Sequence, residues 1–138
     1  MLKILLFLSL ILLELFSSEL AVIGDKNFPT TNLTVQEIRA FFLGKKRYIG
    51  NSKILVMNHE SKSPLRMCFE KNILEKTKRS LERYWRKAYY QGKRPPKIVS
   101  STNMLFSYFY YVHPSIGYCD VNATVNQEVM ILYRVQCE

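Results

Sequence analysis

Apolar residues recur with the period of a helix in some parts of this chain and form short continuous runs in others. In residues 35–42 they recur every three to four positions, as on one face of a helix. Thr34 and Glu37 form a capping box in front of this segment, and Gly44 follows it as a typical left-handed stop. These features predict a helix that ends at about Gly44.

Short apolar runs alternate with further helical patterns over the rest of the chain. The runs predict strands at residues 20–23, 53–57, 98–100, 116–121 and 128–135, and the helical patterns predict helices at 64–74, 80–90 and from a cap at Ser100 or Ser101 to 111. In the second of these helices Trp85 shares a face with Leu81 and Ala88, which predicts a core position. The alternation of strands and helices indicates an α/β fold with a small mixed sheet flanked by helices.

The first residues are typical of a targeting segment. Lys3 precedes residues 4–13, which are apolar apart from Ser9 and are too few for the about 20 residues that span a bilayer. We therefore expect a signal peptide at residues 1–18 and export to the periplasm or beyond, with an uncleaved N-terminal anchor as the alternative. Residues 19–138 then form a single domain.

Positive charge is concentrated in the middle of the chain. The formal net charge is +9, and residues 45–97 contain 16 Lys or Arg and 4 Glu, a net charge of +12. Such a distribution favours an anionic partner: phosphate, nucleic acid or a membrane surface. The alternative is a solvated helix face, because many of these charges lie at helical spacing.

Cysteines and histidines give no catalytic or metal-binding pattern. The spacing of Cys68, Cys119 and Cys137 fits no metal motif; in an exported chain Cys119 and Cys137 could pair, and otherwise all three are small buried residues. His59 and His113 raise acid–base cleavage of RNA as an alternative, but His113 precedes a proline in a helix-ending turn. We expect neither an enzyme nor a cofactor.

One stretch decides between two functions. Residues 61–63 (Ser-Lys-Ser) directly precede the helix that begins at Pro64. Ser63 is a favoured N-cap and proline is favoured at the first helical position, so an ordinary cap explains the pair. Hydroxyl and basic groups at a helix start can also hold an anion. Both interpretations stand at this point.

Four blocks of the sequence, in order, resemble the periplasmic phosphate-binding proteins of ABC importers. They are LTVQEIRAFFLGKKRYI (33–49), SPLRMCFEKNIL (63–74), YWRKAYYQGKRPPKIVSS (84–101) and HPSIGYCDV (113–121). The resemblance implies the type II periplasmic-binding-protein-like fold, in which two α/β lobes hold the anion between them. The blocks match the second lobe, and the sequence is too short for both. We therefore expect a single-lobe, stand-alone member.

The resemblance also implies an anion site. The family's Ser-Gly-Thr run falls on Ser63, Pro64 and Leu65, and its preceding arginine falls on His59. Pro64 removes a backbone donor, Leu65 removes a hydroxyl and His59 is mostly neutral at pH 7. The candidate anion-binding residues are His59, Ser61, Lys62, Ser63 and Arg66.

Three functions remain open on the sequence. The first is an exported phosphate- or anion-binding domain that works with a membrane transporter or another envelope protein in phosphate import. The alternative is a protein-interaction module of the envelope that keeps the fold with a degenerate anion site. A third option is non-specific binding of nucleic acid or anionic lipid through the basic middle of the chain, and no specific nucleic-acid partner is expected.

Overall fold

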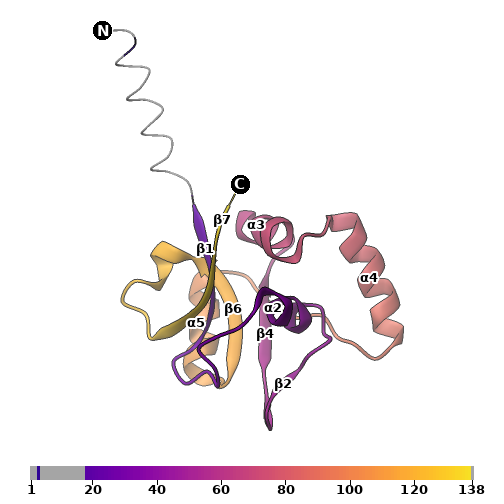
Figure 1. Cartoon of the computed structure of the whole chain (residues 1–138), viewed down its shortest axis with the longest axis horizontal. Helices are drawn as coiled ribbons and strands as arrows, with labels where there is room; N and C mark the ends of the chain where they lie inside the picture. Colours follow the sequence, from indigo (N-terminus) through magenta and orange to yellow (C-terminus); the bar gives the residue numbers. More distant parts are fainter. Residues whose placement is uncertain (1–2, 4–17, 138) are drawn as a thin grey trace.

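The computed structural model describes residue 3 and residues 18–137 (Figure 1). The expected signal peptide falls almost wholly outside the described residues. The elements are β1 (Glu19–Asp25), α2 (Val35–Phe42), β2 (Tyr48–Ile49), β3 (Ser52–Lys53), β4 (Leu55–His59), α3 (Pro64–Phe69), η1 (Glu70–Leu74), α4 (Lys78–Tyr90), β5 (Lys97–Val99), α5 (Thr102–Tyr111), β6 (Ser115–Asp120), η2 (Val121–Thr124) and β7 (Val129–Gln136).

A mixed sheet organises the described residues. Its strand order is β5-β4-β6-β1-β7. Strand β4 is parallel to β5 and β6, whereas β1 is antiparallel to β6 and β7, with a register shift between Val22 and Ile23. Strands β2 and β3 form a separate hairpin. The fold is therefore α/β with a mixed sheet, as the sequence predicts.

Helices cover both faces of the sheet. The side chains of a strand alternate between the two faces, so β1 places apolar residues on each of them. Leu20 and Val22 of β1 pack with residues of α2, α3 and η1 on one face. Ala21 and Ile23 pack with Leu105 and other residues of α5 on the other face. This alternation produces three layers, and it fixes α3, the candidate site helix, on the first face.

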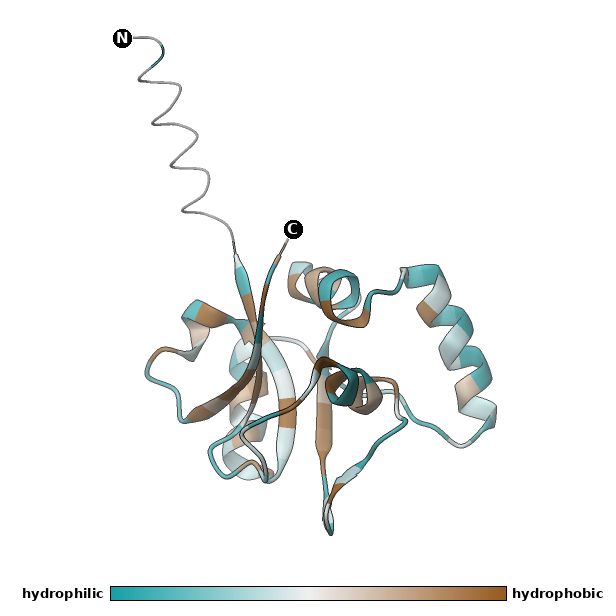
Figure 2. Ribbon diagram, viewed as in Figure 1, coloured by the Kyte–Doolittle hydropathy of each residue, from teal (hydrophilic) through white to brown (hydrophobic). Residues whose placement is uncertain are grey.

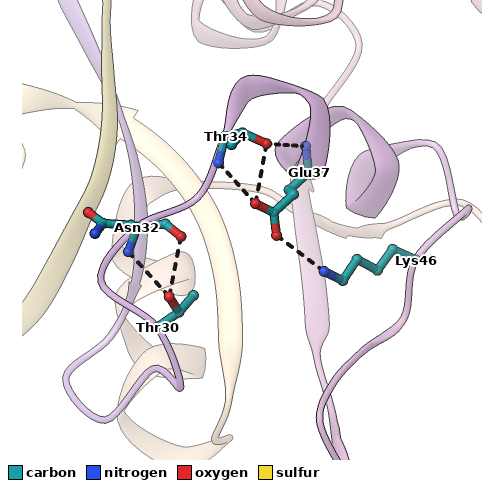
Figure 3. A network of polar contacts seen from close by, with 5 residues as sticks. All are labelled: Thr30, Asn32, Thr34, Glu37 and Lys46. Atoms are coloured by element: carbon teal, nitrogen blue, oxygen red, sulfur yellow. Dashed lines mark hydrogen bonds and ion pairs between the residues drawn. The ribbon is translucent and has the colours of Figure 1, made fainter.

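The start of α2 forms as predicted. The Thr34 hydroxyl accepts a hydrogen bond from the Glu37 backbone N–H at 3.1 Å, and the Glu37 carboxylate accepts one from the Thr34 N–H at 3.3 Å (Figure 3). Lys46 Nζ lies 3.2 Å from the same carboxylate. These contacts lower the pKa of Glu37, the backbone hydrogen bond being the largest cause. Gly44 has φ +70, so the predicted left-handed stop is confirmed.

Trp85 is a correction to the predicted core. Leu81 and Ala88 are buried, but Trp85 is only half-buried, with its ring edge-on to Tyr84 and next to Gly44. Helix α4 lies at one side of the molecule, away from β1 and β7 (Figure 1). Loops join the two ends of α4 to the rest of the chain. The Trp85 indole therefore covers the turn at Gly44 and does not pack on the sheet.

The ribbon of α4 is mainly teal and pale in Figure 2, so this helix is largely hydrophilic. Among the described residues, no helix has both the length and the apolar character that crossing a membrane requires.

Candidate anion-binding site

The candidate site lies where β4 ends and α3 begins. Strand β4 ends at His59, a turn closed by a hydrogen bond from the Ser63 N–H to the Glu60 carbonyl follows at 2.9 Å, and α3 starts at Pro64. The parallel strands β4, β5 and β6 all have their carboxyl ends at this edge. Ligands of open α/β sheets bind at that edge, so the position suits a binding site.

Ser63 occupies the N-cap position, but its side chain does not cap the helix. Its backbone is extended (φ −64, ψ 130) and no side-chain cap hydrogen bond forms. Within the described part of the chain, the Ser63 hydroxyl has no hydrogen-bond partner. Pro64 has no N–H, and the N–H groups of Leu65 and Arg66 have no intrahelical acceptor in the first turn. Three donors at this corner thus lack an acceptor among the described residues.

His59 does not face this corner. It is buried, and its Nε2 lies 2.7 Å from the carbonyl oxygen of Tyr118. Burial is the largest cause of a lowered His59 pKa, and the nearby Arg66 charge lowers it further. The ring is therefore neutral and points into the core, so the expectation that His59 stands in for an anion-binding arginine is corrected.

Arg66 is held by protein groups. Its Nη1 donates to the His59 carbonyl at 2.9 Å, and its Nε donates to Glu70 Oε1 at 3.2 Å. The side chains of Arg66 and Glu70 are 21% and 13% exposed, so this i,i+4 ion pair is largely shielded from water. Arg66 thus ties the start of α3 to the end of β4, and Glu70 offsets its charge.

A buried polar and aromatic cluster supports the turn from beneath. The Asn58 amide oxygen accepts from the His59 N–H at 2.9 Å and from the Tyr118 hydroxyl. The Tyr118 ring stacks on Phe69 of α3 with centroids 4.1 Å apart. Burial is the main cause that raises the pKa of Tyr118 well above its ordinary value, so the hydroxyl stays protonated and donates. Sequence analysis missed this cluster.

Ser61 and Lys62 are exposed and lie beside two surface cavities. One, of about 410 Å³, is lined by Glu60, Ser61, Lys62, Arg66 and Ile98. The other, of about 970 Å³, includes Ser61, Lys62, Pro64 and both half-cystines of a disulfide in its lining. Of the candidate residues, the structure therefore brings Ser61, Lys62 and Ser63 together at the surface and turns His59 inward.

The disulfide joins Cys68 of α3 to Cys137, immediately after β7. Cys119 does not pair with Cys137, which the sequence left as one possibility, because Cys119 lies inside β6 and is buried as a free thiol. Burial, with a smaller effect of Asp120, raises the pKa of Cys119 to about 12. The bridge spans 69 positions of sequence and anchors the site helix to the sheet edge.

The second histidine is remote from the first. His113 Nδ1 lies 3.2 Å from Asp25 Oδ2, and Asp25 also accepts from the Ser115 N–H at 2.9 Å. These residues lie at the start of β6, whereas His59 lies at the end of the parallel strand β4. The two histidines therefore do not form an acid–base pair. The described residues contain no cluster of His, Cys, Asp and Glu suited to a metal ion.

Solved structures share this arrangement of strands and helices. An ABC-type phosphate transport receptor from Vibrio cholerae matches with a TM-score of 0.65 and 20% identity, over 85% of this chain and 47% of the receptor. A putative phosphate ABC transporter substrate-binding protein with bound phosphate from Clostridium perfringens gives 0.66 and 21%, over 83% and 44%. PstS from Borrelia burgdorferi gives 0.63 and 18%, over 84% and 47%.

The chain has the phosphate-receptor fold. It spans less than half the length of each of these receptors, which agrees with the single lobe that the sequence predicts. No family model and no curated protein matches the sequence. Identities of 18–21% show the phosphate-receptor fold alone, so function has to be argued from the residues of this chain.

Proposed function

We propose that this chain is an exported, non-enzymatic domain that binds phosphate or a similar oxyanion weakly at residues 61–63 and the first turn of α3. It would act beside a membrane importer or another envelope protein. The observation that carries the proposal is the Ser63 hydroxyl, which stands at a helix start without capping it. The neighbours with this fold are named as transport receptors and substrate-binding proteins, which agrees with a role other than catalysis.

The chemistry of the corner fits a small oxyanion. The Ser63 hydroxyl and the N–H groups of Leu65 and Arg66 are donors, and the start of a helix carries a partial positive charge. Lys62 adds a full charge in exposed surroundings. A tetrahedral oxyanion accepts several hydrogen bonds at once, so one phosphate could satisfy these groups together.

Binding is expected to be weak, because two strong contributions are absent. Pro64 supplies no backbone donor, and the Arg66 charge is already paired with Glu70. Each hydrogen bond to a charged group contributes about 1.5–3 kcal/mol, so such losses remove about two to four decades of affinity. We expect a dissociation constant for phosphate of about 0.1–10 mM.

A second function rests on the same losses. The His59 ring is turned inward, and the Arg66 charge is paired with Glu70. The site therefore has fewer charged donors for an anion than a site with a free arginine. This favours an envelope protein-interaction module that has kept the fold and lost the ligand. Titrating phosphate while chemical shifts of residues 61–66 are followed separates the two functions: no shift at about 20 mM phosphate, above the expected range, would leave the interaction module.

Export is tested separately. Mass spectrometry of the chain recovered from its native host should show a product that lacks the first residues. A cytoplasmic product that retains Met1 would contradict export. That result would not bear on anion binding, which the phosphate titration tests separately.

A further inference from the structure

A second charged surface lies at the opposite edge of the sheet. A groove of about 570 Å³ opens beside Leu55 and Pro114, at the starts of β4 and β6. Its cationic lining consists of Lys46, Arg47, Lys53, Arg94 and Lys97. We call this surface the basic groove. Within the described chain no Asp or Glu lines it, and the proposed phosphate corner lies beyond the far end of β4.

Three cations of the basic groove are held by neutral partners. Arg47 Nη2 donates to the Gly92 carbonyl at 3.0 Å. The Arg94 guanidinium lies 4.6 Å from the centroid of the Tyr89 ring, and Lys97 Nζ lies 5.1 Å from that of Tyr108. Carbonyls and rings orient a cation without cancelling its charge. These three side chains are therefore positioned and keep their full positive charge.

The positive charge extends past the groove. Lys45 and Lys93 both lie over the ring of Tyr84, at 5.9 and 6.0 Å from its centroid. By contrast, Lys46 within the groove pairs with Glu37, and Arg66 at the other edge of the sheet pairs with Glu70. Arg47, Lys53, Arg94 and Lys97 of the groove, with Lys45 and Lys93 beside it, therefore have no acidic partner among the described residues.

Exposed aromatic rings flank these cations. Tyr48 directly follows Arg47 and is 51% exposed. Tyr90 at the end of α4 is 87% exposed, two residues before Gly92, whose carbonyl holds Arg47. The exposed parts of these two rings offer flat surfaces on which a base can stack.

We propose that the basic groove binds single-stranded nucleic acid without sequence preference. Its phosphates would lie along Arg47, Lys53, Arg94 and Lys97, and bases would stack on Tyr48 and Tyr90. A positive groove that follows the backbone, together with aromatic platforms for bases, is the arrangement by which proteins hold such strands.

The charge density of the groove separates this ligand from an acidic peptide. Each nucleotide of a strand carries one phosphate charge and one base that can stack, whereas a peptide residue carries a negative charge only if it is acidic. A peptide therefore matches the strand only if every residue is acidic. A duplex keeps its bases stacked inside, so it gains nothing from Tyr48 and Tyr90.

The test uses the purified chain and a fluorescent oligothymidylate of about 12 nucleotides, within the site sizes of single-strand binders. Four phosphate contacts predict that the logarithm of the association constant falls with the logarithm of salt concentration with a slope of about −3. Arg47→Ala/Arg94→Ala should halve that slope and weaken binding about 10- to 30-fold at 0.1 M salt.

The matched control removes two charges elsewhere. Lys76 and Lys78 are exposed and lie at the other end of α4, about 18 Å along the helix from Tyr90. Lys76→Ala/Lys78→Ala should change binding less than about threefold, because only diffuse charge is lost. Equal losses in the two double variants would overturn the proposal in favour of a diffuse basic surface.

Stacking is tested by Tyr48→Ala and Tyr90→Ala. Each should weaken oligothymidylate binding about 5- to 100-fold and leave binding of inorganic polyphosphate unchanged. If the tyrosine variants bind the oligonucleotide as the wild type does, the ligand is a bare phosphate chain and the nucleic-acid proposal fails.

Circular dichroism checks folding, and Lys53→Ala/Lys97→Ala provides a second pair of groove variants. Ser63→Ala should leave oligonucleotide binding intact, which separates this groove from the phosphate corner.

Discussion

Arg66 Nη1 donates a hydrogen bond to the His59 carbonyl oxygen at 2.9 Å, so the last residue of β4 and the first turn of α3 are joined by a side chain. The same guanidinium is paired with Glu70. Arg66, which the sequence places among the candidate anion-binding residues, therefore holds the start of α3 in position through contacts within the protein.

Arg66→Ala should destabilise the chain. It removes two hydrogen bonds of a charged group and leaves Glu70 largely buried without its partner, which together cost about 2–3 kcal/mol. Urea unfolding measures the loss. Lys62→Ala, on the exposed side of the same turn, is the control and should stay within about 0.5 kcal/mol of wild type. A stable Arg66→Ala variant that no longer binds phosphate would instead make Arg66 a ligand.

The disulfide should contribute more than any single side chain at the site. In the chain-entropy account, cross-linking residues 69 apart stabilises by about 4 kcal/mol. Cys68→Ser/Cys137→Ser should lower the free energy of unfolding by about this amount, and reductant should then have no further effect. Alkylation of the denatured, unreduced wild type should label Cys119 alone. Labelling of Cys68 or Cys137 in that sample would contradict the pairing.

Local patterns were predictable from the sequence, and long-range partners were not. The capping box of α2 was predicted because Thr34 and Glu37 are three positions apart and need nothing else. The cysteine pairing was missed because it depends on the order of strands: β7 lies next to β1 at the sheet edge, where Cys137 meets α3, whereas Cys119 is enclosed in β6.

The candidate site divides in the same way. Ser63 at the helix start follows from the local sequence, including its proline. The inward turn of His59 depends on the carbonyl of Tyr118, which is 59 positions away and belongs to a neighbouring strand. The pairing of Arg66 with Glu70 could have been found, because an i,i+4 pair of opposite charges is visible in the sequence.

His59 should make stability depend on pH. Its pKa in the folded chain is lowered below 6.5 by burial, so the unfolded chain takes up a proton first as the pH falls. Stability should therefore decrease as the pH falls below about 6.5, by at most about 1.4 kcal/mol per pH unit, until the folded-state pKa is reached. Urea unfolding between about pH 7.5 and 5 measures this, compared with His59→Gln, which should lack that slope.

His113→Gln is the matched control for this pH series, because it removes the other histidine of the chain. It should retain the slope below pH 6.5 that His59 causes. If His59→Gln keeps the slope of the wild type, the acid sensitivity does not come from His59.

Ser63 and Thr77 offer a comparison between a ligand group and a cap. Both are N-cap residues, but only the Thr77 hydroxyl accepts a helix N–H, from Ser80 at 3.1 Å. Thr77→Ala should cost about 1 kcal/mol and leave phosphate binding unchanged. Ser63→Ala should change stability by less than about 0.5 kcal/mol and weaken phosphate binding about 10- to 100-fold, because one hydrogen bond to the anion is lost.

Pro64→Gly/Leu65→Thr should restore donors and tighten binding. If wild type and this restored variant both show no phosphate-dependent shift at residues 61–66, and Ser63→Ala costs as much stability as Thr77→Ala, Ser63 is a cap and the corner binds no anion.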